Sequence, residues 1–161
     1  MKFIKSFLVM VLMFGFLGCE EVQRIASDSP GGAIKGGCLF LPQKIKFNQL
    51  TELTGSQRIT AYIDVFDQFD SRIKAAGVWR FELYEYALRS ANPMGSRIRI
   101  WDDIELTEAG VNQAHWREYL HCYEFELNLE SELGGGKTYI LQAVCFTADG
   151  KHITDTIELK S

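Results

Sequence analysis

The chain has 161 residues, of which 47% are hydrophobic and 24% charged, and its formal net charge is −4. This length suffices for one domain with a hydrophobic core of its own. A protein with a net negative charge lacks the excess of lysine and arginine that binds nucleic acid. Its charge also does not attract it to anionic lipids. We therefore expect no nucleic-acid partner, and any contact with a membrane requires another device.

The N-terminal segment has the pattern of a secretory signal. Lys2 and Lys5 precede an apolar run over residues 7–17, which is too short to span a bilayer comfortably as a permanent helix. The run ends in Phe16-Leu17-Gly18-Cys19, a motif that resembles the lipobox of bacterial lipoproteins. One position departs from the family pattern, because Phe16 stands where the family prefers leucine.

The resemblance implies that residues 1–18 are a signal peptide and that Cys19 becomes the lipid-modified residue. Its thiol would carry a diacylglyceryl group and its new amino terminus a further acyl chain, and two or more chains anchor a protein stably. Glu20 stands where some bacteria read an inner-membrane retention signal, usually aspartate. We therefore expect the cell envelope, and the periplasmic face of the outer membrane or the cell surface rather than the inner membrane. The alternatives are a cleaved signal that leaves Cys19 free, or an uncleaved anchor helix.

Two further segments follow the signal. Removing Lys2 and Lys5 with residues 1–18 lowers the formal charge from −4 to −6. Residues 19–37 are rich in glycine and serine and predict a flexible tether, and residues 38–161 predict one folded domain. Besides Cys19, the odd number of cysteines (Cys38, Cys122 and Cys145) leaves at least one thiol free, and the absence of a CxxC spacing gives no support for structural zinc.

Period-two alternation of apolar residues predicts seven strands in the domain. They are centred on residues 45–47, 59–65, 77–87, 98–100, 123–129, 139–145 and 153–159. Residues 107–120 alone have a helical pattern, with Thr107 as the expected N-cap and about two turns of helix. Short strands separated by turn signals, such as residues 134–136 and Asp149-Gly150, predict an all-β antiparallel sandwich with one helical insertion.

Two stretches favour a particular sandwich. Residues 62–81 resemble a recurring segment of bacterial immunoglobulin-like domains, in which a strand ends in aspartate and the next begins near a Gly-Val pair. Residues 138–159 resemble the last hairpin of those domains. The resemblance implies an immunoglobulin-like topology of about seven strands.

The acidic residues Asp64, Asp67 and Asp70 are the best local candidates for a metal site, because oxygen ligands around a loop suit calcium. A complete calcium-loop signature is absent, and aspartates at such positions more often cap turns through bonds to backbone amides. We favour the turn-capping interpretation, and we expect no cofactor.

Catalytic patterns are weak. Adjacent residues of a strand point to opposite faces, so His121 and Cys122 would not meet, and Glu124 and Glu126 are most simply a solvated face. No nucleophile elbow, zinc-protease motif or phosphate loop is present. We therefore expect a protein that is not an enzyme, with a hydrolase that uses surface carboxylates as the remote alternative.

Aromatic residues give the candidate binding surface. Trp101 alternates with Ile98 and Ile100 and is expected to face outward, and Trp116 could join it in a platform for a sugar or a protein. The competing interpretation is that residues 107–120 fold over Trp101 and that Trp116 buries it. The strand over residues 139–145 is apolar on both faces, which requires a cover from the helical insertion or from a partner.

Cys145 shares the core face of that strand, whereas Cys122 lies on the face of Glu124, so the two are not expected to pair.

Together these features predict a membrane-anchored, non-enzymatic binding or scaffolding module of the cell envelope. Its expected partner is an envelope protein or polysaccharide, and a carbohydrate-binding module is the first alternative.

Overall fold

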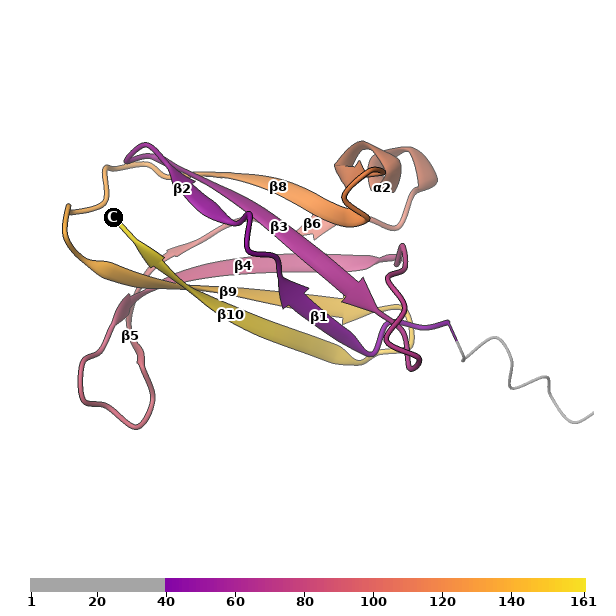
Figure 1. The fold of residues 1–161 in the computed structure, drawn as a ribbon, viewed down its shortest axis with the longest axis horizontal. Helices are drawn as coiled ribbons and strands as arrows, with labels where there is room; N and C mark the ends of the chain where they lie inside the picture. The colour runs from indigo at the N-terminus through magenta and orange to yellow at the C-terminus, as the bar shows by residue number, and fades with distance from the viewer. Residues whose placement is uncertain (1–39) are drawn as a thin grey trace, which may run out of the picture. The chain divides into compact units, whose positions relative to one another are not determined.

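Two antiparallel sheets packed face to face form the fold in the computed structural model, which describes residues 40–161 (Figure 1). Sheet A has the order β1 (Lys44–Phe47), β3 (Arg58–Phe66), β8 (Cys122–Asn128) and β7 (Trp116–Arg117), and β2 (Glu52–Thr54) also pairs with β3. Sheet B has the order β10 (His152–Lys160), β9 (Thr138–Thr147), β4 (Gly77–Tyr86) and β5 (Met94–Ile100), and β6 (Ile104–Glu105) also pairs with β4.

These strand orders match the A-B-E-D and G-F-C-C′ sheets of the immunoglobulin fold. The predicted all-β sandwich is confirmed, and each of the seven expected strands is present. The strands that alternation did not predict are β2, β6 and β7, which have two or three residues each. Among the described residues, no helix has the length and apolar character needed to cross a membrane.

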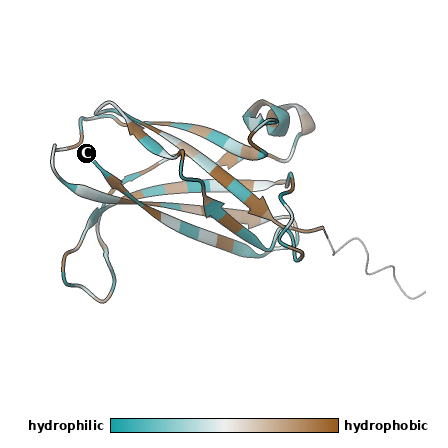
Figure 2. Cartoon of the chain, viewed as in Figure 1, coloured by the Kyte–Doolittle hydropathy of each residue, from teal (hydrophilic) through white to brown (hydrophobic). Residues whose placement is uncertain are grey.

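The core lies between the inward faces of the two sheets, and Figure 2 shows hydrophobic and hydrophilic residues alternating along the strands. Phe125 of β8 is its centre, with ring centroids 5.3 Å from Trp79 and 4.9 Å from Phe81 on the facing strand β4. All three side chains are fully buried. Each such aromatic removes a large apolar area from water, and burial of this kind is the main force that holds two sheets together.

The helix differs from the prediction over residues 107–120. Helix α2 (Ala109–His115) has the expected two turns, but Glu108 rather than Thr107 is its N-cap, and no side chain caps it. Trp116 has extended backbone angles and enters β7, where it pairs with Tyr123 of β8. Its side chain is 6% exposed, so burial of the indole in the core outweighs continuation of the helix.

One side of the sandwich is closed by a contact between its two sheets. The backbone N–H of Phe47, at the edge of sheet A, donates to a carboxylate oxygen of Asp155 in β10 at 2.7 Å. A charge-assisted bond of this kind ties β1 to β10 where two sheet edges meet. The edge of sheet B opposite this contact is β5.

Candidate functional site: the outer face of sheet B

The outer face of sheet B carries the row of β9 that the sequence predicted to need a cover. Ile140, Gln142, Val144 and Phe146 alternate with the core residues of β9. Helix α2 packs instead against β8 of sheet A, where a ring nitrogen of His115 bonds the backbone oxygen of Glu124 at 3.0 Å. The helical insertion is therefore not the cover of β9.

Neighbouring strands extend this row sideways. In register, Tyr84 of β4 lies beside Ile140, Arg80 beside Val144, and Glu82 beside both Gln142 and Ile100 of β5. Ile98 and Ile100 are 40% and 44% exposed, the largest apolar exposures on these strands. The polar outward side chains of β4, which include Arg80 and Glu82, therefore separate the apolar row of β9 from the exposed isoleucines of β5.

The orientation of β5 is the reverse of the expected one. Trp101 was predicted to face outward, but its indole packs against the core and its Nε1–H donates to the backbone oxygen of Asn128 at 2.7 Å. Ile100 lies opposite the outward-facing Glu82, and register shifts on either side of Tyr84 displace the residues before it. Such bulges redirect side chains, and period-two alternation cannot locate them.

Ion pairs hold the polar groups of this face in place. Arg80 donates twice to Asp103, at 2.8 and 2.7 Å, and its guanidinium lies 5.0 Å from the ring centre of Phe146. Glu82 accepts bonds from Tyr84 at 2.6 Å and from Arg97 at 3.0 Å. Burial raises the pKa of Glu82, but these two hydrogen bonds outweigh it and hold that pKa below its usual range. The face therefore combines a mainly apolar centre with arginines already positioned by carboxylates.

Trp101 and Trp116 do not form a joint surface. Trp101 bonds Asn128 at the end of β8, whereas Trp116 pairs with Tyr123 near its start, five residues or about 16 Å away along an extended strand. Trp116 is buried against Tyr123, with ring centroids 5.1 Å apart. Residues 107–120 therefore do not cover Trp101 by means of Trp116, and both indoles belong to the packing of the sandwich.

The acidic residues Asp64, Asp67 and Asp70 are each engaged by other groups. Asp67 is 4% exposed and accepts the N–H groups of Phe69 and Ser71, at 2.8 and 2.9 Å, which is the predicted turn cap. Asp64 pairs with Arg72 at 3.2 Å, and Asp70 pairs with Lys44. Within residues 40–161, no group of three or more potential ligands is placed to hold a metal ion.

The pKa values of Cys122, Cys145 and Glu124 differ from those that catalytic groups need. Cys145 is in the core and Cys122 is outside that cluster, and both are free, as alternation predicted. The burial of Cys122 was not predicted, because its face was expected to be solvated. Burial raises the pKa of Cys122 to about 11 and that of Cys145 to about 12, so both thiols are protonated at neutral pH. The hydrogen bond from Arg117 holds the pKa of Glu124 below its usual range, the opposite of what a general acid needs. Cys19 and Cys38 lie outside the described residues.

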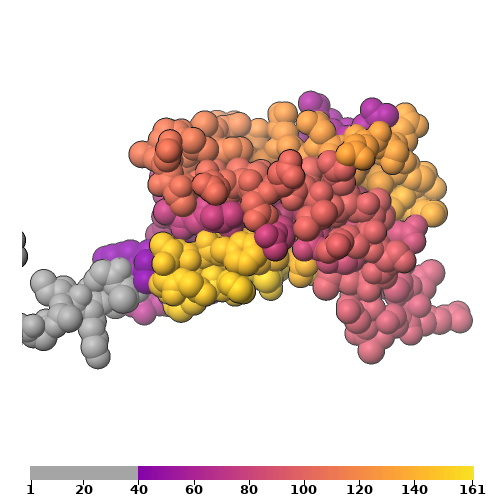
Figure 3. All heavy atoms as spheres, turned by 180° about the vertical axis from the view of Figure 1, so that it is seen from behind, coloured from indigo at the N-terminus to yellow at the C-terminus, as the bar shows by residue number. Residues whose placement is uncertain are grey.

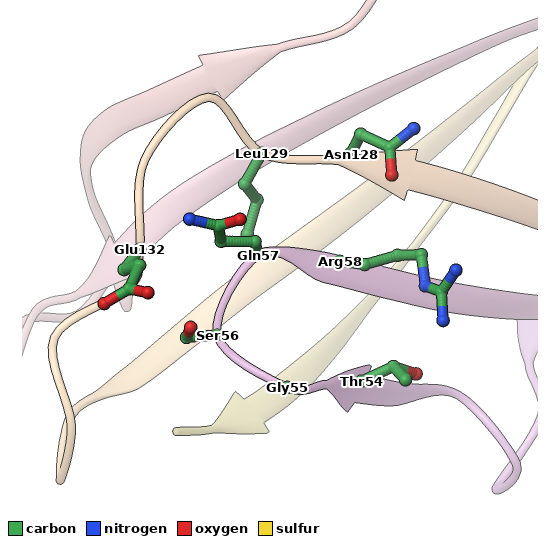
Figure 4. Close-up of a pocket in the computed structure, with 8 residues that line it drawn as sticks. All are labelled: Thr54, Gly55, Ser56, Gln57, Arg58, Asn128, Leu129 and Glu132. Atoms are coloured by element: carbon green, nitrogen blue, oxygen red, sulfur yellow. The ribbon is translucent and has the colours of Figure 1, made fainter.

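A polar hollow of about 530 Å³ lies at the far end of sheet A, between the β2–β3 turn and the end of β8 (Figure 4). Its lining consists of Thr54, Gly55, Ser56, Gln57, Arg58, Asn128, Leu129 and Glu132. None of these residues is aromatic, and a sugar site of the expected kind would need a flat ring to stack on. The hollow is therefore a weaker candidate than the face of sheet B.

Comparison with known proteins adds a fold-level similarity. No family model matches the chain, and no curated protein matches it. Among solved structures, it is similar to the sporulation control protein Spo0M from Bacillus subtilis, at 11% sequence identity and a TM-score of 0.38. The match covers 73% of this chain and 49% of that one, so the chain spans about half the length of Spo0M.

Proposed function

We propose that the protein is a lipid-anchored, non-enzymatic binding module of the cell envelope, and that it docks a partner protein on the outer face of sheet B. The observation that carries the binding role is the pair of exposed isoleucines, Ile98 and Ile100, on the edge strand β5 of the sheet. Apolar side chains that stand together in solvent on the edge strand of a sheet favour contact with a partner.

The composition of the face supports a protein partner. Interface centres are depleted in free charges and enriched in aromatic residues and arginine, with a polar rim around them. Here Arg80 and Arg97 are neutralised by Asp103 and Glu82, and the alternating threonines of β10 provide a polar margin. Because the ion pairs exist before binding, a partner pays little to order these long side chains. A polysaccharide is the alternative ligand, for which the tyrosines of β4 would have to supply the stacking surface.

The anchor is tested at Cys19. In cells that express Cys19→Ala, we expect protein that keeps its leader or is released, and that takes up no labelled fatty acid. The physical reason is that the substitution removes the thiol to which the diacylglyceryl group would be attached, and the acidic domain has no charge-based attraction to lipid. Membrane fractionation and mass spectrometry of the mature N-terminus measure the outcome. A variant that stays on the membrane with its leader removed contradicts lipidation at this residue.

The binding face is tested by adding charge to its exposed centre. In the double variant Ile98→Asp/Ile100→Asp, we expect at least tenfold weaker recovery of the partner cross-linked to the wild-type protein in intact envelopes, because burying a carboxylate without a counter-ion is costly. Leu88→Asp is the matched control, since Leu88 is 82% exposed in the β4–β5 loop. Thermal melts of all variants should agree within a few degrees.

Two other outcomes redirect this proposal. If the double variant binds its cross-linked protein as the wild type does, the face of sheet B is not the docking surface. If isolated cell-wall polysaccharide retains the wild-type protein and loses the variant, the alternative carbohydrate-binding function is favoured over a protein partner.

A further inference from the structure

The described chain begins at one end of the sandwich (Figure 1), and two exposed phenylalanines lie in its first segment and in the β3–β4 loop. Phe40 is 66% exposed and Phe69, in the β3–β4 loop, is 61% exposed, and their ring centroids lie 6.5 Å apart. The two rings belong to segments that are distant in sequence and stand together in solvent. Exposed phenylalanine contributes nothing to the core, so the pair needs another explanation.

The structure holds Phe69 outward through its backbone. Asp67 accepts the N–H groups of Phe69 and Ser71, and Asp70 completes the turn with a φ of +58°, a left-handed conformation in which aspartate is tolerated. Lys44 at the start of β1 pairs with Asp70, which ties the segment after Phe40 to this turn. Phe69 is therefore displayed by a hydrogen-bonded turn, and Phe40 lies four residues before the lysine that pairs with this turn.

The charges around the pair do not oppose a lipid surface. Two exposed acids at this end face lysines: Asp70 pairs with Lys44, and Asp149 pairs with Lys151 at 3.1 Å. Lys151 also bonds the side chain of Gln43 at 3.2 Å, which places the β9–β10 turn at the same end. These two ion pairs reduce the repulsion that Asp70 and Asp149 would otherwise experience from anionic headgroups.

We infer that Phe40 and Phe69 insert into the headgroup region of the bilayer that holds the lipid anchor, and that they set the orientation of the domain on it. This inference rests on the anchor of the proposed function. Twenty residues separate Cys19 from Phe40, and the tether expected from the sequence would have a root-mean-square reach of roughly 25 Å. A contact too weak to recruit a free protein is effective when the anchor keeps the pair at high local concentration.

Other occupants fit this end less well. The two rings are tilted by 51°, so they do not make the flat platform on which a sugar stacks. A protein interface of standard size buries about 800 Å² on each partner, far more than two side chains supply. Insertion into a bilayer does not require a binding partner of complementary shape. It therefore suits a few exposed apolar side chains that are surrounded by polar residues.

The consequence is a defined presentation of the binding face. The long strands of sheet B run from this end toward the β4–β5 loop, which projects at the other end of the molecule (Figures 1 and 3). With Phe40 and Phe69 in the bilayer, the strands stand away from the membrane and the outer face of sheet B faces sideways. A partner would then meet it from beside the anchor rather than from the membrane below.

The test uses the full lipidated chain in vesicles of phosphatidylethanolamine and phosphatidylglycerol that contain nitroxide-quencher lipids. A fluorophore is attached at Ser71→Cys, beside Phe69, or at Leu88→Cys in the β4–β5 loop, both in a Cys38→Ser background. Cys122 and Cys145 are buried and do not react under native conditions. We expect quenching at position 71 to be at least threefold stronger than at position 88.

The double variant Phe40→Ser/Phe69→Ser should lower quenching at position 71 to the level at position 88, whereas Ile98→Ser/Ile100→Ser should leave it unchanged. Equal quenching of both positions in an acylated wild-type protein, or undiminished quenching in the phenylalanine variant, overturns the inference and leaves the anchor standing. A mature protein whose mass shows no acyl chain contradicts the anchor, and the inference fails with it.

Discussion

Replacement of Trp116 by alanine should lower the free energy of unfolding by about 3–5 kcal/mol, the usual cost of truncating a buried aromatic side chain. Trp116 is 6% exposed, and its ring packs edge-on against Tyr123 at 5.1 Å. Lys74 lies over its other surface at 5.1 Å and adds a cation–π contact. Urea unfolding of residues 38–161, which include the whole described core, measures the change.

Two variants serve as controls for this prediction. Tyr119→Ala alters the same β7–β8 hairpin at a residue that is 82% exposed, so it should change stability by less than about 0.5 kcal/mol. Trp116→Phe keeps an aromatic ring and removes a buried Nε1–H that has no hydrogen-bond partner, so it should cost clearly less than alanine. An unchanged free energy of unfolding for Trp116→Ala would contradict the packing role, and a loss of partner capture with unchanged stability would place Trp116 in a binding surface.

Trp116 also shows where sequence patterns reach their limit. Its spacing to Leu120 fits a helix, and nothing local distinguishes that pattern from a helix followed by a short strand. Tertiary packing determines where the helix ends. The chain becomes extended at Trp116, and this places the indole in the core beside Tyr123. Strands with strict alternation, such as residues 59–65, were predictable because one face of each is fully buried.

The candidate site was predictable in part. The two apolar faces of β9 are visible in the sequence, and they indicated that its outer row needs a cover. The exposure of Ile98 and Ile100 was not predictable, since the register shifts beside Tyr84 depend on how β5 meets the end of the sheet. The turn-capping role of Asp67 was predictable from chemistry, because a short carboxylate bonds amides two to four residues ahead of it.

Removal of a single hydroxyl, in Tyr123→Phe, should destabilise the protein by about 1–3 kcal/mol without creating a cavity of note. Tyr123 is fully buried, and its hydroxyl accepts the N–H of Ala75 at 2.8 Å and lies 2.8 Å from Oδ1 of Asn112. The amide of Asn112 in turn donates to the backbone oxygens of Ala75 and Leu106, at 2.9 and 3.0 Å. Phenylalanine would leave a buried donor and a buried acceptor unpaired.

This network joins α2 and the β3–β4 loop to the core strand β8, so two further measurements separate it from simple loss of packing. Hydrogen exchange of α2 should accelerate in Tyr123→Phe, and adding Asn112→Ala should cost less than the sum of the two single changes, because both break one network.

Burial raises the pKa of Tyr123, against the opposing effect of its bonds to Ala75 and Asn112. The folded state therefore holds the phenolic proton more tightly than the unfolded state, whose tyrosines titrate near pH 10, and stability from this source is lost as the pH rises above that value. The stability gap between wild type and Tyr123→Phe should then narrow above about pH 10. If the difference in stability between wild type and Tyr123→Phe stays constant above about pH 10, deprotonation of Tyr123 does not change the stability of the folded state. If the losses in Tyr123→Phe and Asn112→Ala add up in the double variant, the two side chains stabilise the protein independently.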